Sequence, residues 1–256
     1  MIQQVAIVGS GYMGGGIAQV FALAGRDVQI ADVSADHAAR SRARIIDEAA
    51  DYAGRGLFPE DAAESVAARV TAAESIEVAV RDADFIEEAV PEILSVKHDI
   101  LSRISAGCRP EALIGSNTST ISIATLATEV VSPERFLGVH FSNPAPFIPG
   151  VEVIPHAATR SGAATEVIAL LKEVGKLGVE VADVTGFVLN RLQYALFSEA
   201  ARLVEEGVAS AEAVDTIAHF INSNSIITAS IGGCLKTRRH RGAQADTGWL
   251  LRLSIQ

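Results

Sequence analysis

A histidine and a glutamate on either side of a rigid loop are the first residues of this sequence that could do chemistry together. His140 lies near the end of an apolar run, Phe136–Phe141, that predicts a buried strand, and Glu152 lies in the next apolar run, Val151–Ile154. The loop between the runs contains three prolines, and because proline fixes the backbone, the connection is short and stiff. A lone histidine at a strand end is most often structural, whereas a histidine beside a carboxylate is typical of general acid–base catalysis. The spacing therefore favours a catalytic pair.

A glycine-rich turn near the start of the chain has the pattern of a dinucleotide-binding site. The apolar run Val5–Val8 predicts a strand, the letters GSGYMG follow it directly, and a helix is predicted from there to Ala24. A second predicted strand, Val28–Ala31, ends at Asp32. The G-x-G-x-x-G pattern alone is often only a turn, but strand, turn, helix, strand and acid together form the Rossmann fingerprint.

Each part of this fingerprint has a physical reason for its position. The first glycine permits a sharp turn, the second lets a pyrophosphate approach the helix N-terminus, and the third lets the helix pack close to the sheet. The carboxylate of Asp32 is placed to accept hydrogen bonds from ribose hydroxyls, and it would repel the extra phosphate of NADP. No arginine follows it directly, so NAD is favoured. The predicted NAD contacts in this segment are Gly9, Gly11, Tyr12, Met13, Gly14 and Asp32.

A polar cluster follows another predicted strand. Residues Ser116–Thr120 come directly after the apolar run Ala112–Gly115. Open α/β sheets bind ligands at the carboxyl ends of strands, so the cluster could line a pocket, or it could only cap the helix predicted over 123–130. Farther along, Asn190 interrupts the apolar helix predicted over 187–206, where it is either a pocket residue or a hydrogen bond between helices. The residues alone leave these alternatives open.

The predicted strands and helices alternate along the chain, as in a doubly wound α/β sheet. Further strands are predicted at 85–90 and 179–181, and further helices at 35–53, 60–69, 76–83, 93–105, 165–177 and 211–220. Gly178 is expected to end the helix over 165–177. The two helices after the second strand are more than a minimal sheet needs, so they are either an arm for a long substrate or surface helices only. The predicted fold class is α/β, with a Rossmann-type, doubly wound, mostly parallel sheet and a second, smaller, all-helical domain.

The composition limits the partners and the location. The 256 residues carry a formal net charge of −10 and are 49% hydrophobic, which suits a sizeable core but neither a nucleic-acid surface nor an anionic membrane. No apolar run is long enough to span a membrane, and no leader segment precedes the first strand. Cys108 and Cys234 lack metal-ligand spacing and are expected to be reduced. A cytoplasmic protein that holds no metal is predicted.

Five motifs in order resemble the L-3-hydroxyacyl-CoA dehydrogenase family, which includes 3-hydroxybutyryl-CoA dehydrogenases. They are the glycine loop, the segment EEAVPE with Lys97 after it, the element SNTS, the segment HFSNP with VE after it, and the sequence GFVLNR. The similarity extends from Ile2 to about Asp215. It implies an NAD-binding domain over residues 1–182 and a helical C-terminal domain over residues 183–256.

The resemblance implies an NAD-dependent enzyme that reversibly oxidises a 3-hydroxyacyl-CoA to the 3-ketoacyl-CoA. His140 would take the hydroxyl proton while hydride leaves C3, and Glu152 would hold the imidazole tautomer and stabilise the imidazolium. Ser119, Asn143 and Asn190 would orient the hydroxyl and carbonyl groups of the substrate.

The resemblance also implies a cofactor side and a quaternary structure. Glu92 and Lys97 would lie near the nicotinamide half of NAD, and Asn143 is counted among the cofactor-binding residues as well. Members of the family commonly dimerise through the helical domain, so a homodimer is expected. The resemblance also implies a role in fatty acid metabolism.

Two departures from the family concern the substrate. A CoA-binding arm would favour hydroxyl and basic side chains, but the predicted helix over 35–53 carries Asp47, Glu48 and Asp51, with Arg55 following as a possible compensation. The segment PFIPG also resembles relatives that act on small, non-thioester substrates. An alternative is therefore a dehydrogenase of a small free 3-hydroxy acid, such as a carnitine- or gulonate-like compound.

A third departure is the end of the chain. Residues 222–256 lack the Gly-Pro turn and the Asp-x-x-Gly-Leu-Asp segment of the family, and they contain a basic run, 236–241, and an isolated Trp249. The overall acidity argues against nucleic-acid binding by this run. The tail after about residue 220 is interpreted as divergent or read in a shifted frame, which leaves a truncated helical domain. A non-catalytic NAD-binding protein is the corresponding alternative.

Overall fold

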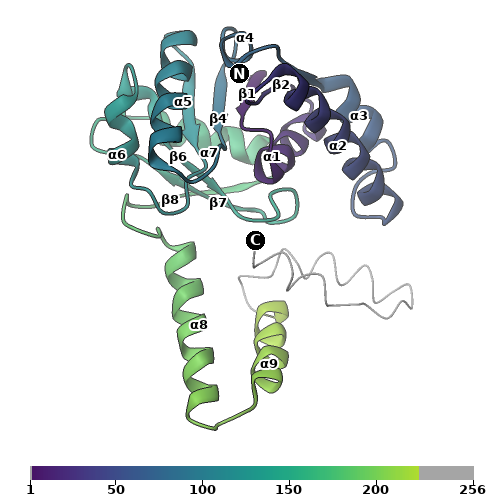
Figure 1. Ribbon diagram of the computed structural model, residues 1–256, viewed down its shortest axis with the longest axis vertical. Helices are drawn as coiled ribbons and strands as arrows, with labels where there is room; N and C mark the ends of the chain where they lie inside the picture. Colours follow the sequence, from purple (N-terminus) through teal and green to yellow (C-terminus); the bar gives the residue numbers. More distant parts are fainter. Residues whose placement is uncertain (1, 225–256) are drawn as a thin grey trace. The chain divides into compact units, whose positions relative to one another are not determined.

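An eight-stranded sheet forms the centre of the computed structural model, which describes residues 2–224 (Figure 1). The strands are β1 (Gln4–Val8), β2 (Asp27–Ala31), β3 (Val70–Ala72), β4 (Phe85–Glu88), β5 (Leu113–Ser116), β6 (Phe136–Phe141), β7 (Gly150–Ile154) and β8 (Leu177–Glu180). They stand in the order β3-β2-β1-β4-β5-β6-β7-β8. Neighbouring strands from β3 to β6 pair in parallel, β7 is antiparallel to β6, and β8 is parallel to β7. The predicted mostly parallel, doubly wound sheet is confirmed.

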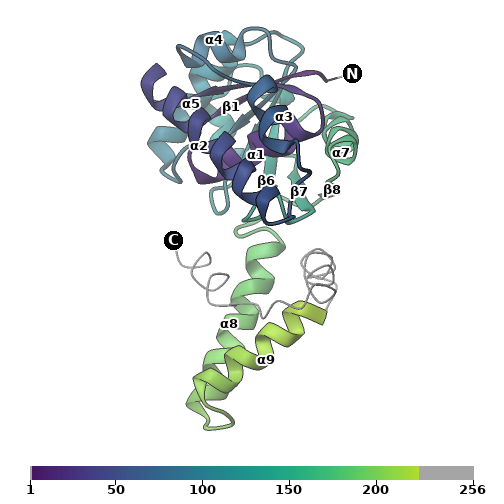
Figure 2. The same cartoon turned by 90° about the vertical axis from the view of Figure 1, so that its right-hand side faces the viewer.

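Helices cover both faces of this sheet (Figure 2). They are α1 (Tyr12–Leu23), α2 (Ala35–Gly54), α3 (Ala62–Arg69), α4 (Ile76–Val80), α5 (Leu94–Gly107), α6 (Ile123–Leu126) and α7 (Ala163–Glu173), with short 3-10 turns at Ala127–Glu129 and Pro133–Arg135. Side chains of α1, α2, α3 and α7 share one hydrophobic core, and those of α4, α5 and α6 share the other. Because both faces are covered, strands such as β1 and β6 are mostly apolar on both sides, which is why they read as nearly continuous apolar runs in the sequence. The central strand β4 instead carries two buried glutamates, Glu87 and Glu88.

The chain divides into two compact units, Met1–Arg191 and Leu192–Gln256. Helix α8 (Leu189–Glu205) begins at the end of the first unit, and α9 (Ala211–Asn224) follows it in the second. The predicted helical C-terminal part is thus confirmed for the described residues, while a domain boundary at residue 182 stays a prediction. Cys234, the basic run 236–241 and Trp249 lie outside the described residues. Among the helices that the structure describes, none has the length and apolar character needed to cross a membrane.

The sequence analysis missed one strand and misplaced the end of one helix. The strand β3 was not predicted, because its three residues, VTA, continue directly from α3 and are too short to show a strand pattern. The helix α7 ends before Gly175, which has a φ of +78°, and Gly178 lies inside strand β8. The glycine that ends the helix is therefore Gly175, three residues earlier than expected. The sequence did not distinguish the two, because either Gly175 or Gly178 could have ended the helix.

One buried carboxyl group in the sheet lacks a partner. Glu87 in β4 is fully buried, and neither of its carboxyl oxygens has a hydrogen-bond partner among the described residues. Burial, and then the adjacent Glu88, raise the pKa of Glu87 well above 4.5, with Lys97 acting in the opposite direction. A Cβ on Gly115, its neighbour in β5, would lie 2.2 Å from one carboxyl oxygen, so the glycine provides the space that the acid occupies.

Replacing Glu87 by leucine is expected to stabilise the protein by about 1–3 kcal/mol at neutral pH, because an unpartnered buried polar group is removed. Because the pKa of Glu87 is higher in the folded protein than in the unfolded chain, its burial lowers the stability progressively as the pH rises from the unfolded pKa through the folded pKa. The gain should therefore be larger at neutral pH than at acid pH. Urea denaturation at both pH values measures it, with Glu87→Gln as the control of matched size. Equal stability of the leucine variant and the wild type at neutral pH would contradict the prediction.

Candidate active site

The glycine loop after β1 presents an open helix N-terminus. Gly9 has a φ of +93°, and a Cβ on Gly14 would lie 1.9 Å from the carbonyl oxygen of Gly9, so only glycine fits there. A Cβ on Gly11 would meet nothing within 4 Å. No side chain of the described residues caps α1, and its first turn holds no acid. A helix N-terminus of this kind attracts a phosphate group, so the loop fits the pyrophosphate of NAD.

Asp32 holds this loop in place. Its Oδ2 accepts hydrogen bonds from the Ser10 amide at 2.8 Å and the Ser10 hydroxyl at 2.6 Å, and its Oδ1 accepts one from the Val33 amide. Burial raises the pKa of Asp32, but the hydrogen bonds from Ser10 and Val33 outweigh it, so the net shift is downward and the group is ionised. Contact between Asp32 and the ribose stays a prediction. From the other side, Arg44 of α2 donates to the Ser10 and Gly11 carbonyl oxygens.

His140 and Glu152 face each other across the antiparallel strands β6 and β7, where they are paired residues. The imidazole Nδ1 lies 2.7 Å from Oε2 of Glu152, and the side chains are only 5% and 12% exposed. A carboxylate can only accept, so Nδ1 carries the proton and Nε2 of the neutral ring is an acceptor. The hydroxyl of Ser119 lies 3.2 Å from Nε2. Burial raises the pKa of Glu152, but its hydrogen bonds with His140 and two backbone amides produce a net lowering.

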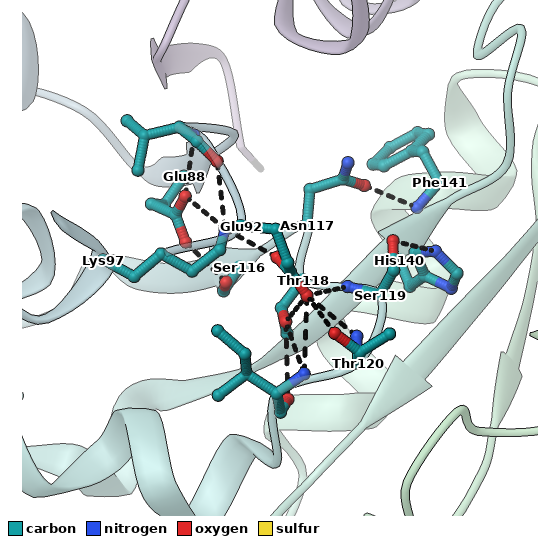
Figure 3. Close-up of polar contacts among 12 residues, drawn as sticks. Glu88, Glu92, Lys97, Ser116, Asn117, Thr118, Ser119, Thr120, His140 and Phe141 are labelled. Atoms are coloured by element: carbon teal, nitrogen blue, oxygen red, sulfur yellow. Dashed lines mark hydrogen bonds and ion pairs between the residues drawn. The ribbon is translucent and has the colours of Figure 1, made fainter. Parts of the chain in front are cut away.

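The loop that carries Ser119 is held by Glu92, as Figure 3 shows. One oxygen of Glu92 accepts hydrogen bonds from the Thr118 hydroxyl at 2.7 Å, the Ser119 amide at 2.9 Å and the Thr120 amide at 2.8 Å. Burial opposes ionisation, but these hydrogen bonds and the nearby Lys97 lower the pKa of Glu92 to about 2. An ionised carboxylate therefore fixes the backbone that carries Ser119.

Lys97 lies inside the protein next to Glu88 and Glu92 (Figure 3). Its Nζ is 2.8 Å from Oε1 of Glu88 and 3.4 Å from Oε2 of Glu92, and it also donates to the Val90 carbonyl oxygen. The Ser116 hydroxyl donates to the other oxygen of Glu88. The Lys97 side chain is 1% exposed, so the structure shows it supporting Glu92, and direct contact of Lys97 with NAD stays a prediction.

The structure bears on two alternatives that the residues left open. The polar cluster 116–120 does not cap α6, because Asp183 does so: its carboxylate accepts from the Ser122 hydroxyl and from the amides of Ile123 and Ala124. Asn190 is turned toward the site, since its Nδ2 donates to the Ser119 carbonyl oxygen at 3.0 Å. The predicted Asn143 is exposed and lies on the loop after β6.

Two residues with supporting roles were not predicted. Asn117 accepts a hydrogen bond from the Phe141 amide at 2.8 Å, which fixes the end of β6 next to His140. Lys176 donates to three carbonyl oxygens of the proline-rich loop, those of Ala145, Pro146 and Ile148. Burial lowers the pKa of Lys176 to about 8. Asn117 belongs to the polar cluster and so had a signal, whereas the sequence GKL around Lys176 had none.

A Rossmann-type sheet with an open glycine loop, and with a histidine near the carboxyl end of β6 paired to a carboxylate on β7, defines the chain as an NAD-dependent dehydrogenase. Two family models match it in succession: "3-hydroxyacyl-CoA dehydrogenase, NAD binding domain" over residues 4–185 and "3-hydroxyacyl-CoA dehydrogenase, C-terminal domain" over residues 186–223. The chain belongs to the 3-hydroxyacyl-CoA dehydrogenase family.

Several proteins are similar to this chain over most of its length. The 3-hydroxybutyryl-CoA dehydrogenase of Bradyrhizobium diazoefficiens is 39% identical over 218 residues, which cover 84% of this chain and 73% of that protein. The crystal structure of (S)-3-hydroxybutyryl-CoA dehydrogenase from Ralstonia eutropha is similar with a TM-score of 0.76 at 34% identity, covering 83% of this chain and 75% of that one. The crystal structure of 5-formyl-3-hydroxy-2-methylpyridine 4-carboxylic acid 5-dehydrogenase, an NAD+-dependent dismutase, has a TM-score of 0.76 at 33% identity, covering 94% and 79%.

Proposed function

We propose that the protein oxidises the C3 hydroxyl of a short 3-hydroxyacyl-CoA, of the 3-hydroxybutyryl-CoA type, to the 3-keto group, and catalyses the reverse reaction. The observation that carries the proposal is the chain of contacts from Ser119 through His140 to Glu152, in which Nε2 is left as a hydrogen-bond acceptor. An alcohol can lose hydride only if its proton is accepted at the same time, and this imidazole is buried and oriented to accept it.

The side chains of the site have two roles, proton transfer and positioning of the substrate. His140 accepts the hydroxyl proton at Nε2, and Glu152 stabilises the imidazolium through the Nδ1 proton. Ser119, fixed by Glu92 and by Asn190, orients the hydroxyl group. NAD, bound at the glycine loop, would supply the hydride acceptor.

The acidic side chains of α2 do not exclude a CoA substrate. Glu48 is paired with Arg44 of the same helix at 2.7 Å, and Asp51 is paired with Arg55, the residue directly after the helix, at 3.2 Å. Two of the three acids therefore have arginine partners. The second candidate is the same chemistry on a small free acid. It is favoured by the similarity, at 33% identity, to the pyridine carboxylic acid dehydrogenase.

Absorbance of NADH decides between the two candidates. We expect NADH to be oxidised on addition of acetoacetyl-CoA, and free acetoacetate to give at most a small fraction of that rate. Turnover with the free acid but not with the thioester would replace the first candidate by the second. NADH binding without turnover on either compound would leave the non-catalytic alternative.

We also propose that the enzyme is a cytoplasmic homodimer acting in fatty acid metabolism. The helix α8 supports the dimer, because its apolar side chains Leu192, Tyr194 and Phe197 are exposed in the single chain.

A further inference from the structure

The turn before α8 has an unusual backbone and lies against the catalytic pair. Gly186 and Phe187 have φ values of +76° and +46°, and the second is rare for a residue with a large side chain. The amide of Phe187 donates to the Val184 carbonyl oxygen at 2.9 Å. Its ring is buried, with its centroid 5.7 Å from that of the His140 ring. The strained turn is thus fixed beside the imidazole.

This conformation directs two backbone amides at one oxygen of Glu152. Oε1 of Glu152 accepts hydrogen bonds from the amides of Val188 at 2.8 Å and Leu189 at 2.9 Å, while Oε2 is bonded to His140. The two oxygens of the carboxylate therefore have separate partners, and the amides determine which oxygen is left for the imidazole. Leu189 is the first residue of α8, so these amides are those that a helix leaves without partners within the helix.

We infer that the amides of Val188 and Leu189 are positioning groups for the His140–Glu152 pair, so that the start of α8 orients the carboxylate on which the imidazole depends. The inference rests on the proposed function for the role of the pair. Two other contacts hold the turn before α8 in the position that directs these amides at Glu152. Asp183, just before the turn, binds the first turn of α6, and Asn190, just after it, binds the loop of Ser119. The turn before α8 and the first residues of α8 are therefore built into the active site.

The charges around Glu152 are consistent with this role. His140 faces it from β6, and the amides face it from the start of α8, where the positive end of the helix dipole favours a carboxylate. The other charged side chains on β8, in the turn before α8 and in the first turn of α8 are Glu180, Asp183 and Arg191. Asp183 is bonded to the start of α6. The hydrogen bonds from both amides contribute to the lowered pKa of Glu152.

Leu189→Pro tests the inference by deleting a single N–H group. Proline is well tolerated at the first position of a helix and has no amide hydrogen. Leu189→Ala is the matched control, because it removes the same side chain but keeps the amide. With acetoacetyl-CoA, kcat of the proline variant should be about ten-fold below that of the alanine variant, as expected for one hydrogen bond to a charged group, with KM changed less than about two-fold.

A second measurement does not depend on turnover. In protein labelled with 13C at the glutamate carboxyl carbons, the signal of Glu152 is identified by its loss in Glu152→Gln and is titrated with pH. The pKa of Glu152 should be higher in Leu189→Pro than in Leu189→Ala and the wild type. If all three proteins share one Glu152 pKa, or if the two variants share one kcat, the amide has no positioning role. If the wild type does not turn over any thioester, the proposed function fails, and the titration alone decides the inference.

Discussion

Replacing His140 by glutamine is expected to lower kcat by about 10²- to 10⁴-fold, the range typical for loss of a general acid–base. The amide of glutamine can hydrogen-bond but cannot accept a proton at neutral pH. NADH binding should be retained, because the glycine loop and His140 belong to different strand ends. Stopped-flow or steady-state NADH absorbance with acetoacetyl-CoA measures the change.

A second histidine provides the control for this variant. His156, beyond the end of β7, bonds the Pro133 carbonyl oxygen and has no contact with Glu152 in the described structure. His156→Gln should leave kcat within about two-fold. If His140→Gln were to retain more than a tenth of the wild-type kcat, another group would have to accept the proton.

Variants of Glu152, the carboxylate partner of His140, test the same prediction further. Glu152→Gln should lower kcat less than His140→Gln, and the double variant should be no slower than His140→Gln alone, because the two side chains act as one unit. The lowered pKa of Glu152 also determines how the stability of the protein depends on pH. The stability that the pair contributes is present above the unfolded pKa of Glu152 and is lost as the pH falls through the folded value.

Replacing Lys97 by methionine is expected to destabilise the protein by about 3–5 kcal/mol, because it leaves the buried carboxylate of Glu88 without its cation. Glu88 and Lys97 are 0% and 1% exposed, so water cannot take the place of the missing ammonium group. Burial already raises the pKa of Glu88, with Lys97 opposing that shift. Urea denaturation followed by circular dichroism measures the loss.

Two further variants separate this effect from the loss of any lysine. Lys172 lies exposed on α7, so Lys172→Met should change stability by less than about 0.5 kcal/mol. Adding Glu88→Gln to Lys97→Met should restore part of the lost stability, since the uncompensated charge is then removed. A Lys97→Met protein as stable as the Lys172→Met control would show that the buried pair contributes nothing to folding.

The sequence determined those features that depend on neighbours along the chain. The glycine loop could be located because the turn after β1 and the close packing of α1 need glycine at fixed positions, and Gly14 leaves no room for a Cβ. The pairing of His140 with Glu152 could also be expected, because a short loop joins two adjacent strands and places their residues opposite one another. Features of this kind can be predicted because the residues that form them are close together in the sequence.

Only the tertiary structure decided how these elements support one another. Glu92 follows one strand and Ser119 the next, and their contact exists because β4 and β5 are adjacent in the sheet. The carboxylate of Glu152 is completed by amides 36 and 37 residues farther along the chain. Such contacts join residues whose separation in sequence has no fixed period, so no spacing rule reveals them. They form because the fold brings charged and polar groups into a buried site, where each must find a partner.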